Sequence, residues 1–209
     1  LRDASARRGG EYSVPHSLEG HTKMTYTPLH VRMPEHSVIN LKNTSYSITA
    51  EFTVTDAPAS GVLACQGGNM AGWSLYLDES GKPVFLYNCF GHDLTFVKGK
   101  DALTAGDHKL VVTYMHDGGF GAGGEATLSL DGVDLDSARL SRTVPVIFSM
   151  SGETFDVGRD TGAPVGPYPH DYAFTGKIKG ITLERLEEPD EKVKAQERKG
   201  RFEAGLSSQ

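Results

Sequence analysis

The fold class is decided by residues 47–55, which read Ser47-Ile48-Thr49-Ala50-Glu51-Phe52-Thr53-Val54-Thr55. Apolar residues occupy every second position from Ile48, and polar residues occupy the positions between them. Successive side chains of a β-strand point to opposite faces, so this stretch predicts a strand with one face in a core and one in water. A helix would instead repeat its apolar residues every three or four positions.

Strand signals of this kind recur along the chain, separated by turns rich in glycine and proline. Further strands are predicted at 61–65, 73–77, 83–88, 94–97, 109–115, 126–130, 133–135, 146–148, 155–157 and 177–186. Asp131-Gly132 predicts a tight two-residue hairpin, and Gly180 between Ile178 and Ile181 predicts a bulge. Many short strands with no long helical period between them predict an all-β, antiparallel sandwich.

Composition divides the 209 residues into three parts. Residues 1–23 are polar without periodicity and predict an arm or an interdomain linker. Residues 24–186 carry the strand signals and are long enough for one domain with a single core. Residues 187–209 are charged, and the Pro-Asp pair at 189–190 followed by alternating charges predicts a short helix or tail.

The bulk properties exclude some classes of partner. The net charge is −6 and no basic stripe is present, so we expect no nucleic-acid partner. No apolar run approaches membrane-spanning length, and the first residues lack the apolar core of a signal peptide, so we expect a soluble domain with no membrane partner. Cys65 and Cys89 lie in predicted strands and read as small buried side chains; they could pair only if their strands are neighbours.

The stretch from Phe155 to Val165 is the strongest candidate site. A short strand leads into a turn that carries Asp156, Arg159 and Asp160, and glycines and a proline make this turn rigid. Such a turn could bind a ligand through Arg159 or a cation through Asp156 and Asp160, or the side chains could only lock the turn. Ca²⁺ is the cation considered, although it needs six or more oxygen ligands; otherwise no cofactor is expected.

Two other loops hold candidate ligand-binding residues. Tyr168 and His170 lie in a proline-rich segment that could present aromatic side chains to a partner or could pack on the edge of the sandwich. His92 lies in a predicted turn beside Asp93.

The single tryptophan and one pair of glutamates are also candidate site residues. Trp73 could be a platform for a sugar ring, but it shares a strand face with apolar residues and is predicted to lie in the core. Glu51 and Glu125 are the nearest candidates for a pair of hydrolase carboxylates.

Several ordered segments together resemble the C-terminal domain that follows the catalytic domain in a group of bacterial arylsulfatases. The matching segments span roughly 24 to 186 and include Met33-Pro34-Glu35, residues 43–50, 61–63, 72–76, Tyr87-Asn88, 126–128, Asp131-Gly132, 142–145 and 155–165. The resemblance implies a concanavalin A-like jelly roll. It also implies the bacterial cytoplasm or periplasm as the compartment.

The catalytic half of such a sulfatase has no counterpart in this chain. Its nucleophile arises within a C/S-x-P-x-R motif, and neither Cys65 nor Cys89 is followed by that pattern. No catalytic residue is therefore assigned. The resemblance implies a non-catalytic accessory domain that packs on a catalytic sulfatase domain or mediates a homo-oligomer.

Three functions follow from these observations. The first is the sulfatase accessory domain, which should expose an apolar or aromatic patch. The second is a lectin-like module that binds sulfated or neutral glycans, with or without Ca²⁺. The third is a glycoside hydrolase of the same fold class, which requires two facing carboxylates.

Overall fold

The strand predicted from residues 47–55 is present as β2 (Tyr46–Val54). In the computed structural model, which describes residue 18 and residues 20–149, 152–187 and 189–207, β2 buries Ile48, Ala50 and Phe52 and exposes Glu51. The alternation therefore has the predicted sense, with one face in the core and one in water.

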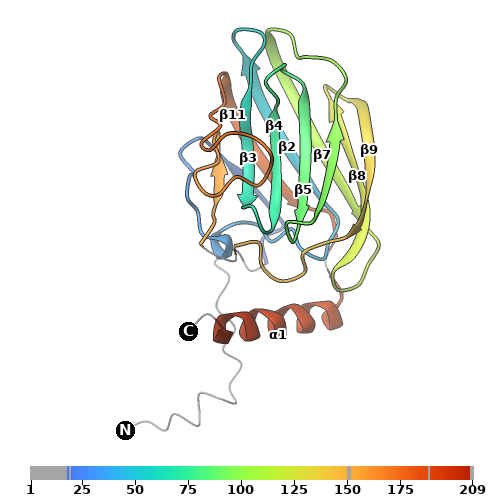
Figure 1. Ribbon diagram of the computed structural model, residues 1–209. Helices are drawn as coiled ribbons and strands as arrows, with labels where there is room; N and C mark the ends of the chain where they lie inside the picture. The colour runs from blue at the N-terminus through green and yellow to red at the C-terminus, as the bar shows by residue number, and fades with distance from the viewer. Residues whose placement is uncertain (1–17, 19, 150–151, 188, 208–209) are drawn as a thin grey trace, which may run out of the picture.

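The strands form two antiparallel sheets packed face to face (Figure 1). The six-stranded sheet has the order β1-β11-β2-β7-β8-β9 and the five-stranded sheet has the order β10-β3-β4-β5-β6. The other strands of the first sheet are β1 (Lys23–Tyr26), β11 (Lys177–Arg185), β7 (Gly106–His116), β8 (Ala122–Leu130) and β9 (Val133–Arg142). The second sheet consists of β10 (Phe155–Val157), β3 (Gly61–Gly67), β4 (Gly72–Leu77), β5 (Pro83–Cys89) and β6 (Asp93–Lys98). The predicted all-β jelly-roll sandwich is confirmed.

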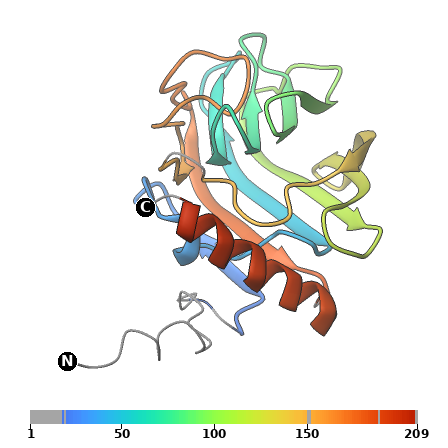
Figure 2. The ribbon, with the colours of Figure 1, turned by 60° about the horizontal axis from the view of Figure 1, so that its bottom comes forward.

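Two helical elements complete the fold. A 3₁₀ turn, η2 (Glu35–Ser37), follows β1, and α1 (Glu191–Ser207) lies across one end of the sandwich (Figure 2). Neither helix is long and apolar enough to cross a membrane within the described part of the chain.

Local signals in the sequence are reproduced in the strand register. Leu130 pairs with Val133 across the Asp131-Gly132 turn, and the register of β11 against β2 shifts between Ile178 and Gly180, as predicted for a bulge. Trp73 is fully buried in the core, as predicted, and its indole N–H donates to Gln66 Oε1 at 3.2 Å.

The cysteines are both buried and unpaired. Cys65 lies on β3 and Cys89 on β5, and β4 separates these two strands. The interpretation of two small buried side chains is therefore confirmed, and no disulfide links them.

Two predictions about the position of elements differ from the structure. The expected strand at 146–148 is absent, because the backbone groups around it bind side chains instead of another strand. Lys23, which was predicted to belong to the arm, is the first residue of β1 and pairs with Glu184 of β11. Residues 1–17 of the predicted arm lie outside the described residues. The predicted C-terminal helix is present and runs through Gly200, where the absence of a side chain lets the helix approach Val146.

Candidate functional site

Asp156 lies on β10 and accepts hydrogen bonds from three separate segments. Its Oδ1 accepts the backbone N–H of Arg32 at 2.5 Å. Its Oδ2 accepts the hydroxyls of Thr154 at 3.0 Å and Thr161 at 2.9 Å. The carboxylate is buried, and these bonds satisfy it. It thereby links the residues just before and just after β10 to the loop that contains Arg32.

Asp160 has the same kind of role one turn later. Its Oδ2 accepts the backbone N–H of Val165 at 3.0 Å and the hydroxyl of Tyr168 at 2.7 Å. Burial raises the pKa of Asp160, and the neighbouring charge of Asp156 raises it further, while these hydrogen bonds act in the opposite direction. The turn is therefore fixed by a buried carboxyl group.

Asp156, Asp160 and Cys65 lie together, with one ligand-type atom of each within 4.8 Å of the others. The predicted proximity of the two carboxylates is thus present. Burial raises the pKa of the Cys65 thiol, and its sulfur lies 3.6 Å from the carbonyl oxygen of Arg159, so it is a protonated donor. A protonated thiol and two carboxylates that already accept N–H and O–H groups suit Ca²⁺ poorly. The calcium prediction gains no support from this geometry.

The predicted ligand-binding residues Arg159, His170 and His92 lie exposed on the surface. Arg159 faces Asp171 at 3.5 Å, and each side chain is about half exposed, so this ion pair contributes little. His170 is exposed in the same loop, and His92 is exposed in the turn between β5 and β6.

Tyr168 points inward and forms part of a second apolar layer. Its ring stacks on Tyr172 at a centroid distance of 5.6 Å and meets Tyr76 edge-on at 5.0 Å. With Val165 it packs on outward side chains of β3, β4 and β5. Figure 1 shows this orange segment crossing in front of the five-stranded sheet. The segment therefore packs on the sandwich and does not present the aromatic side chain of Tyr168 to a partner, but it covers the outer face of the five-stranded sheet and not the predicted edge.

The outer face of the six-stranded sheet is lined by hydroxyl groups. The strand register places Thr182, Thr49 and Ser129 in one cross-strand row, with Val111 between the last two. A second row two residues away follows the same register. The hydroxyl face is defined here as Thr25, Thr182, Thr49 and Ser129 of the first row and Ser47, Thr113, Thr127 and Ser137 of the second.

The centre of the hydroxyl face has free hydrogen-bonding capacity. At its margins the hydroxyls of Thr25 and Thr182 bond each other at 2.8 Å, and Ser137 donates to Glu125 at 2.8 Å. Within the described residues, the four central hydroxyls make no side-chain hydrogen bond; they belong to Ser47, Thr49, Thr113 and Thr127. Neighbouring strands lie about 4.8 Å apart and the two rows about 7 Å apart, so these groups form a compact array.

Charged and apolar groups border this array. Lys23 pairs with Glu184 at 2.8 Å on one side, and Arg139 pairs with Asp117 on the other. Met115 lies next to the second row and is 54% exposed. The hydroxyl face thus offers donors, acceptors, charges and apolar side chains on a single surface.

Glu51 and Glu125 do not form a pair of facing carboxylates. Glu51 lies opposite Lys109 on β7, whereas Glu125 lies opposite Met115 on the same strand. Six residues of a strand span about 20 Å, far beyond the 5–10 Å that glycoside hydrolysis requires. This pair therefore cannot serve the glycoside hydrolase hypothesis.

The fold is similar to domains in two sialidase structures. The CBM40 of the Ruminococcus gnavus IT-sialidase matches with a TM-score of 0.50 and 15% identity, over 75% of this chain and 84% of that chain. The leech intramolecular trans-sialidase, in complex with 2,7-anhydro-Neu5Ac, matches with a TM-score of 0.52 and 12% identity, over 85% of this chain and 27% of that chain. No protein-family model and no curated protein matches the sequence. At these identities the likeness shows a shared jelly-roll fold.

The sequence indicated the turn at Asp156 but not the hydroxyl face. The alternation around Thr49 predicts a polar face for one strand, yet Thr113 and Thr127 lie more than sixty residues further along the chain. Only the order β2-β7-β8 brings their hydroxyls together. A sequence signal that pairs these strands would have been needed to predict the array.

Proposed function

We propose that this chain is a lectin-like module that binds glycans on its hydroxyl face. The observation that carries the proposal is the compact array of free hydroxyls of Ser47, Thr49, Thr113 and Thr127. Sugars present several hydroxyl groups on a rigid ring, and each can donate and accept, as serine and threonine hydroxyls do. A pre-formed array therefore matches this chemistry without a metal ion.

Of the two outer faces of the sandwich, that of the six-stranded sheet is the more accessible to a ligand. The outer face of the five-stranded sheet is covered by the segment with Val165 and Tyr168, whereas Glu51 and Met115 on the six-stranded sheet are exposed. The structural neighbours are carbohydrate-binding jelly-roll domains, which favours a glycan over other small polar ligands.

Calorimetric titration with a panel of neutral, sulfated and sialylated oligosaccharides, including 3′-sialyllactose, tests the proposal. The wild-type chain should bind at least one of them. The double variant Thr49→Val/Thr113→Val keeps β-branched side chains but removes two hydroxyls, so affinity should fall by about tenfold or more.

The matched control is Thr95→Val, on the opposite sheet. Thr95 is half-buried on β6 and makes no side-chain hydrogen bond to the described residues. This variant should bind as the wild type does. Equal losses in both variants would point to a general effect on the fold and would contradict the proposal.

The sulfatase accessory domain remains a second candidate. Its basis is the ordered set of sequence segments that resemble the C-terminal domain of arylsulfatases. The coding sequence upstream of Leu1 tests it: a C/S-x-P-x-R motif there would support a catalytic partner domain. A sulfatase partner and a glycan-binding surface are compatible, since an accessory domain can also bind substrate.

A further inference from the structure

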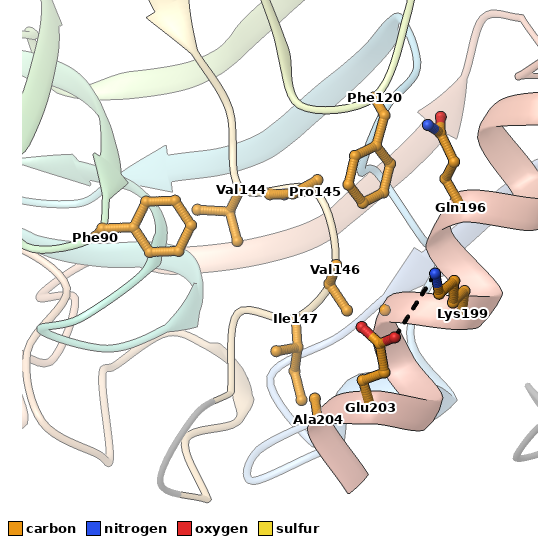
Figure 3. A pocket seen from close by; sticks show the side chains of 11 residues that line it. Phe90, Phe120, Val144, Pro145, Val146, Ile147, Gln196, Lys199, Glu203 and Ala204 are labelled. Carbon is orange, nitrogen blue, oxygen red and sulfur yellow. Dashed lines mark ion pairs between the residues drawn. The ribbon is translucent and has the colours of Figure 1, made fainter. Parts of the chain in front are cut away.

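A cleft of about 480 Å³ lies between α1 and the loops at one end of the sandwich. Its sandwich wall is apolar and contains Phe90, Phe120 and the segment from Val144 to Ile147. Its helix wall carries the polar side chains of Gln196, Lys199 and Glu203, with Gly200 and Ala204 between them (Figure 3). None of the residues that line the cleft belongs to the hydroxyl face.

The sandwich wall is held in place by buried side chains. Tyr87 accepts the N–H of Val144 at 3.0 Å. Asn43 donates to the carbonyl oxygen of Pro145 at 2.7 Å and accepts the N–H of Gly121 at 2.8 Å. These bonds fix the backbone of Val144 and Pro145 and also that of Gly121, next to Phe120. The apolar wall is therefore formed before any ligand binds.

The helix wall is anchored by a separate network. Asn40 donates to the buried carboxylate of Glu197 at 2.6 Å, and Arg201 pairs with the same carboxylate. Gly200 faces Val146 so closely that a Cβ atom would lie 2.7 Å from Val146 Cγ2. The two walls are therefore positioned independently of any ligand.

Phe90 occupies a backbone conformation that suits a different residue type. Its φ of 58° lies in the left-handed region, which bulky residues rarely adopt and which asparagine and glycine tolerate. The residue is nevertheless 37% exposed, as is Phe120, and both residues line the cleft. A phenylalanine with a strained backbone that buries only part of its side chain contributes little to folding. Strained residues of this kind cluster at ligand sites.

We propose that this cleft binds a small amphiphilic molecule, with an aromatic or aliphatic body against Phe90, Phe120 and Ile147 and a polar group toward the helix. The volume lies within the range of about 300–1,000 Å³ that small-molecule sites occupy. Gln196, Lys199 and Glu203 supply both donors and acceptors for the polar group. Lys199 lies 3.9 Å from Glu203 and is largely exposed, so its ammonium group can turn toward a ligand at little cost.

A fluorescence titration with N-phenyl-1-naphthylamine, a neutral amphiphilic probe, tests this inference on the full chain. The wild type should show saturable enhancement with a single site. Phe90→Asn removes one ring and suits the positive φ, so probe affinity should fall by about tenfold while the unfolding midpoint stays the same or rises. Ala204→Leu, which places a larger side chain in the cleft, should weaken the probe as well.

The matched control is Phe202→Asn on the same helix. Phe202 is 51% exposed and does not line the cleft, so this variant should bind the probe as the wild type does. Three results would overturn the inference: no saturable signal in the wild type, unchanged affinity in Phe90→Asn, or an equal loss in Phe202→Asn. Glycan binding on the hydroxyl face is measured separately, so either proposal can fail without the other.

Discussion

Lys42 and Glu35 form an ion pair inside the protein, with 2.5 Å between Nζ and Oε1. The Lys42 side chain is 2% exposed, and its ammonium group also lies over the ring of Phe148 at 4.8 Å. The second oxygen of Glu35 accepts the backbone N–H groups of Phe148 and Ser149, both at 3.0 Å. Burial raises the pKa of Glu35, but Lys42 and these N–H groups outweigh it and leave the pKa below its usual value.

Replacing Lys42 by methionine should strongly destabilise the fold. The change leaves the buried Glu35 carboxylate without its cation, and breaking a buried pair costs about 3–5 kcal/mol. Lys23→Met, in the exposed pair with Glu184, is the control and should cost less than about 1 kcal/mol. Urea denaturation of both variants measures the difference, and similar losses would contradict the structural role of the Lys42–Glu35 pair.

Gly61 should tolerate no side chain, because it lies against the segment that covers the five-stranded sheet. Its φ is 113°, and a Cβ atom there would lie 2.3 Å from the carbonyl oxygen of Ala173. We expect Gly61→Ala to cost more than about 3 kcal/mol. Gly132→Ala is the control: φ is 86° but nothing lies within 4 Å, so only the local strain of about 1 kcal/mol applies. Thermal unfolding of the two variants distinguishes these costs.

The strands were predictable from the sequence because their alternation is local. Residues 47–55 alone specify which face of β2 is buried, and Asp131-Gly132 alone specifies a hairpin. The stretch 146–148 has the same apolar character but forms no strand. The carbonyl of Pro145 and the N–H of Phe148 bind the side chains of Asn43 and Glu35, which lie about a hundred residues away in the sequence, and no local pattern records those bonds.

The candidate sites were less predictable than the fold. The roles of Asp156 and Asp160 as a turn lock follow from a short motif, since most of their hydrogen-bond donors lie within eight residues. The hydroxyl face and the cleft depend instead on contacts between distant segments. Phe90 became informative only once its backbone angle was known, because the sequence gives no sign of a positive φ at a phenylalanine.

His108 should make the fold more stable in mild acid. Burial lowers the pKa of its imidazole, but the bond of 2.9 Å to Asp131 and the contact with the carbonyl of Thr104 outweigh this and raise it. A raised folded-state pKa gives stability that is fully present below the unfolded value of about 6.5 and is lost as the pH rises through the folded value.

The variant His108→Gln isolates this contribution. The stability of the wild type relative to the variant should be greatest near pH 5.5 and should decrease as the pH rises above about 6.5. Denaturation measured across this range provides the test. A difference that is constant with pH would show that His108 does not gain a proton on folding.

Asp160 should also make the fold less stable as the pH rises, because the pKa of its buried carboxyl group is raised. Since the folded state holds the proton more tightly, stability falls as the pH rises from about 3.8 through the folded pKa. Asp160→Asn keeps an oxygen that can accept from Val165 and Tyr168 but removes the charge. The variant should therefore gain stability relative to the wild type as the pH rises from 4 to 7, and a relative loss would contradict the assignment.

The central claim is that the hydroxyls of Thr49 and Thr113 bind glycans, and paired calorimetric titrations test it most directly. The wild-type chain and the Thr49→Val/Thr113→Val variant are titrated with the same panel of neutral, sulfated and sialylated oligosaccharides. We predict saturable heat for at least one glycan with the wild type and an affinity reduced about tenfold in the variant. No heat with any glycan, or equal affinities in both proteins, would contradict the claim.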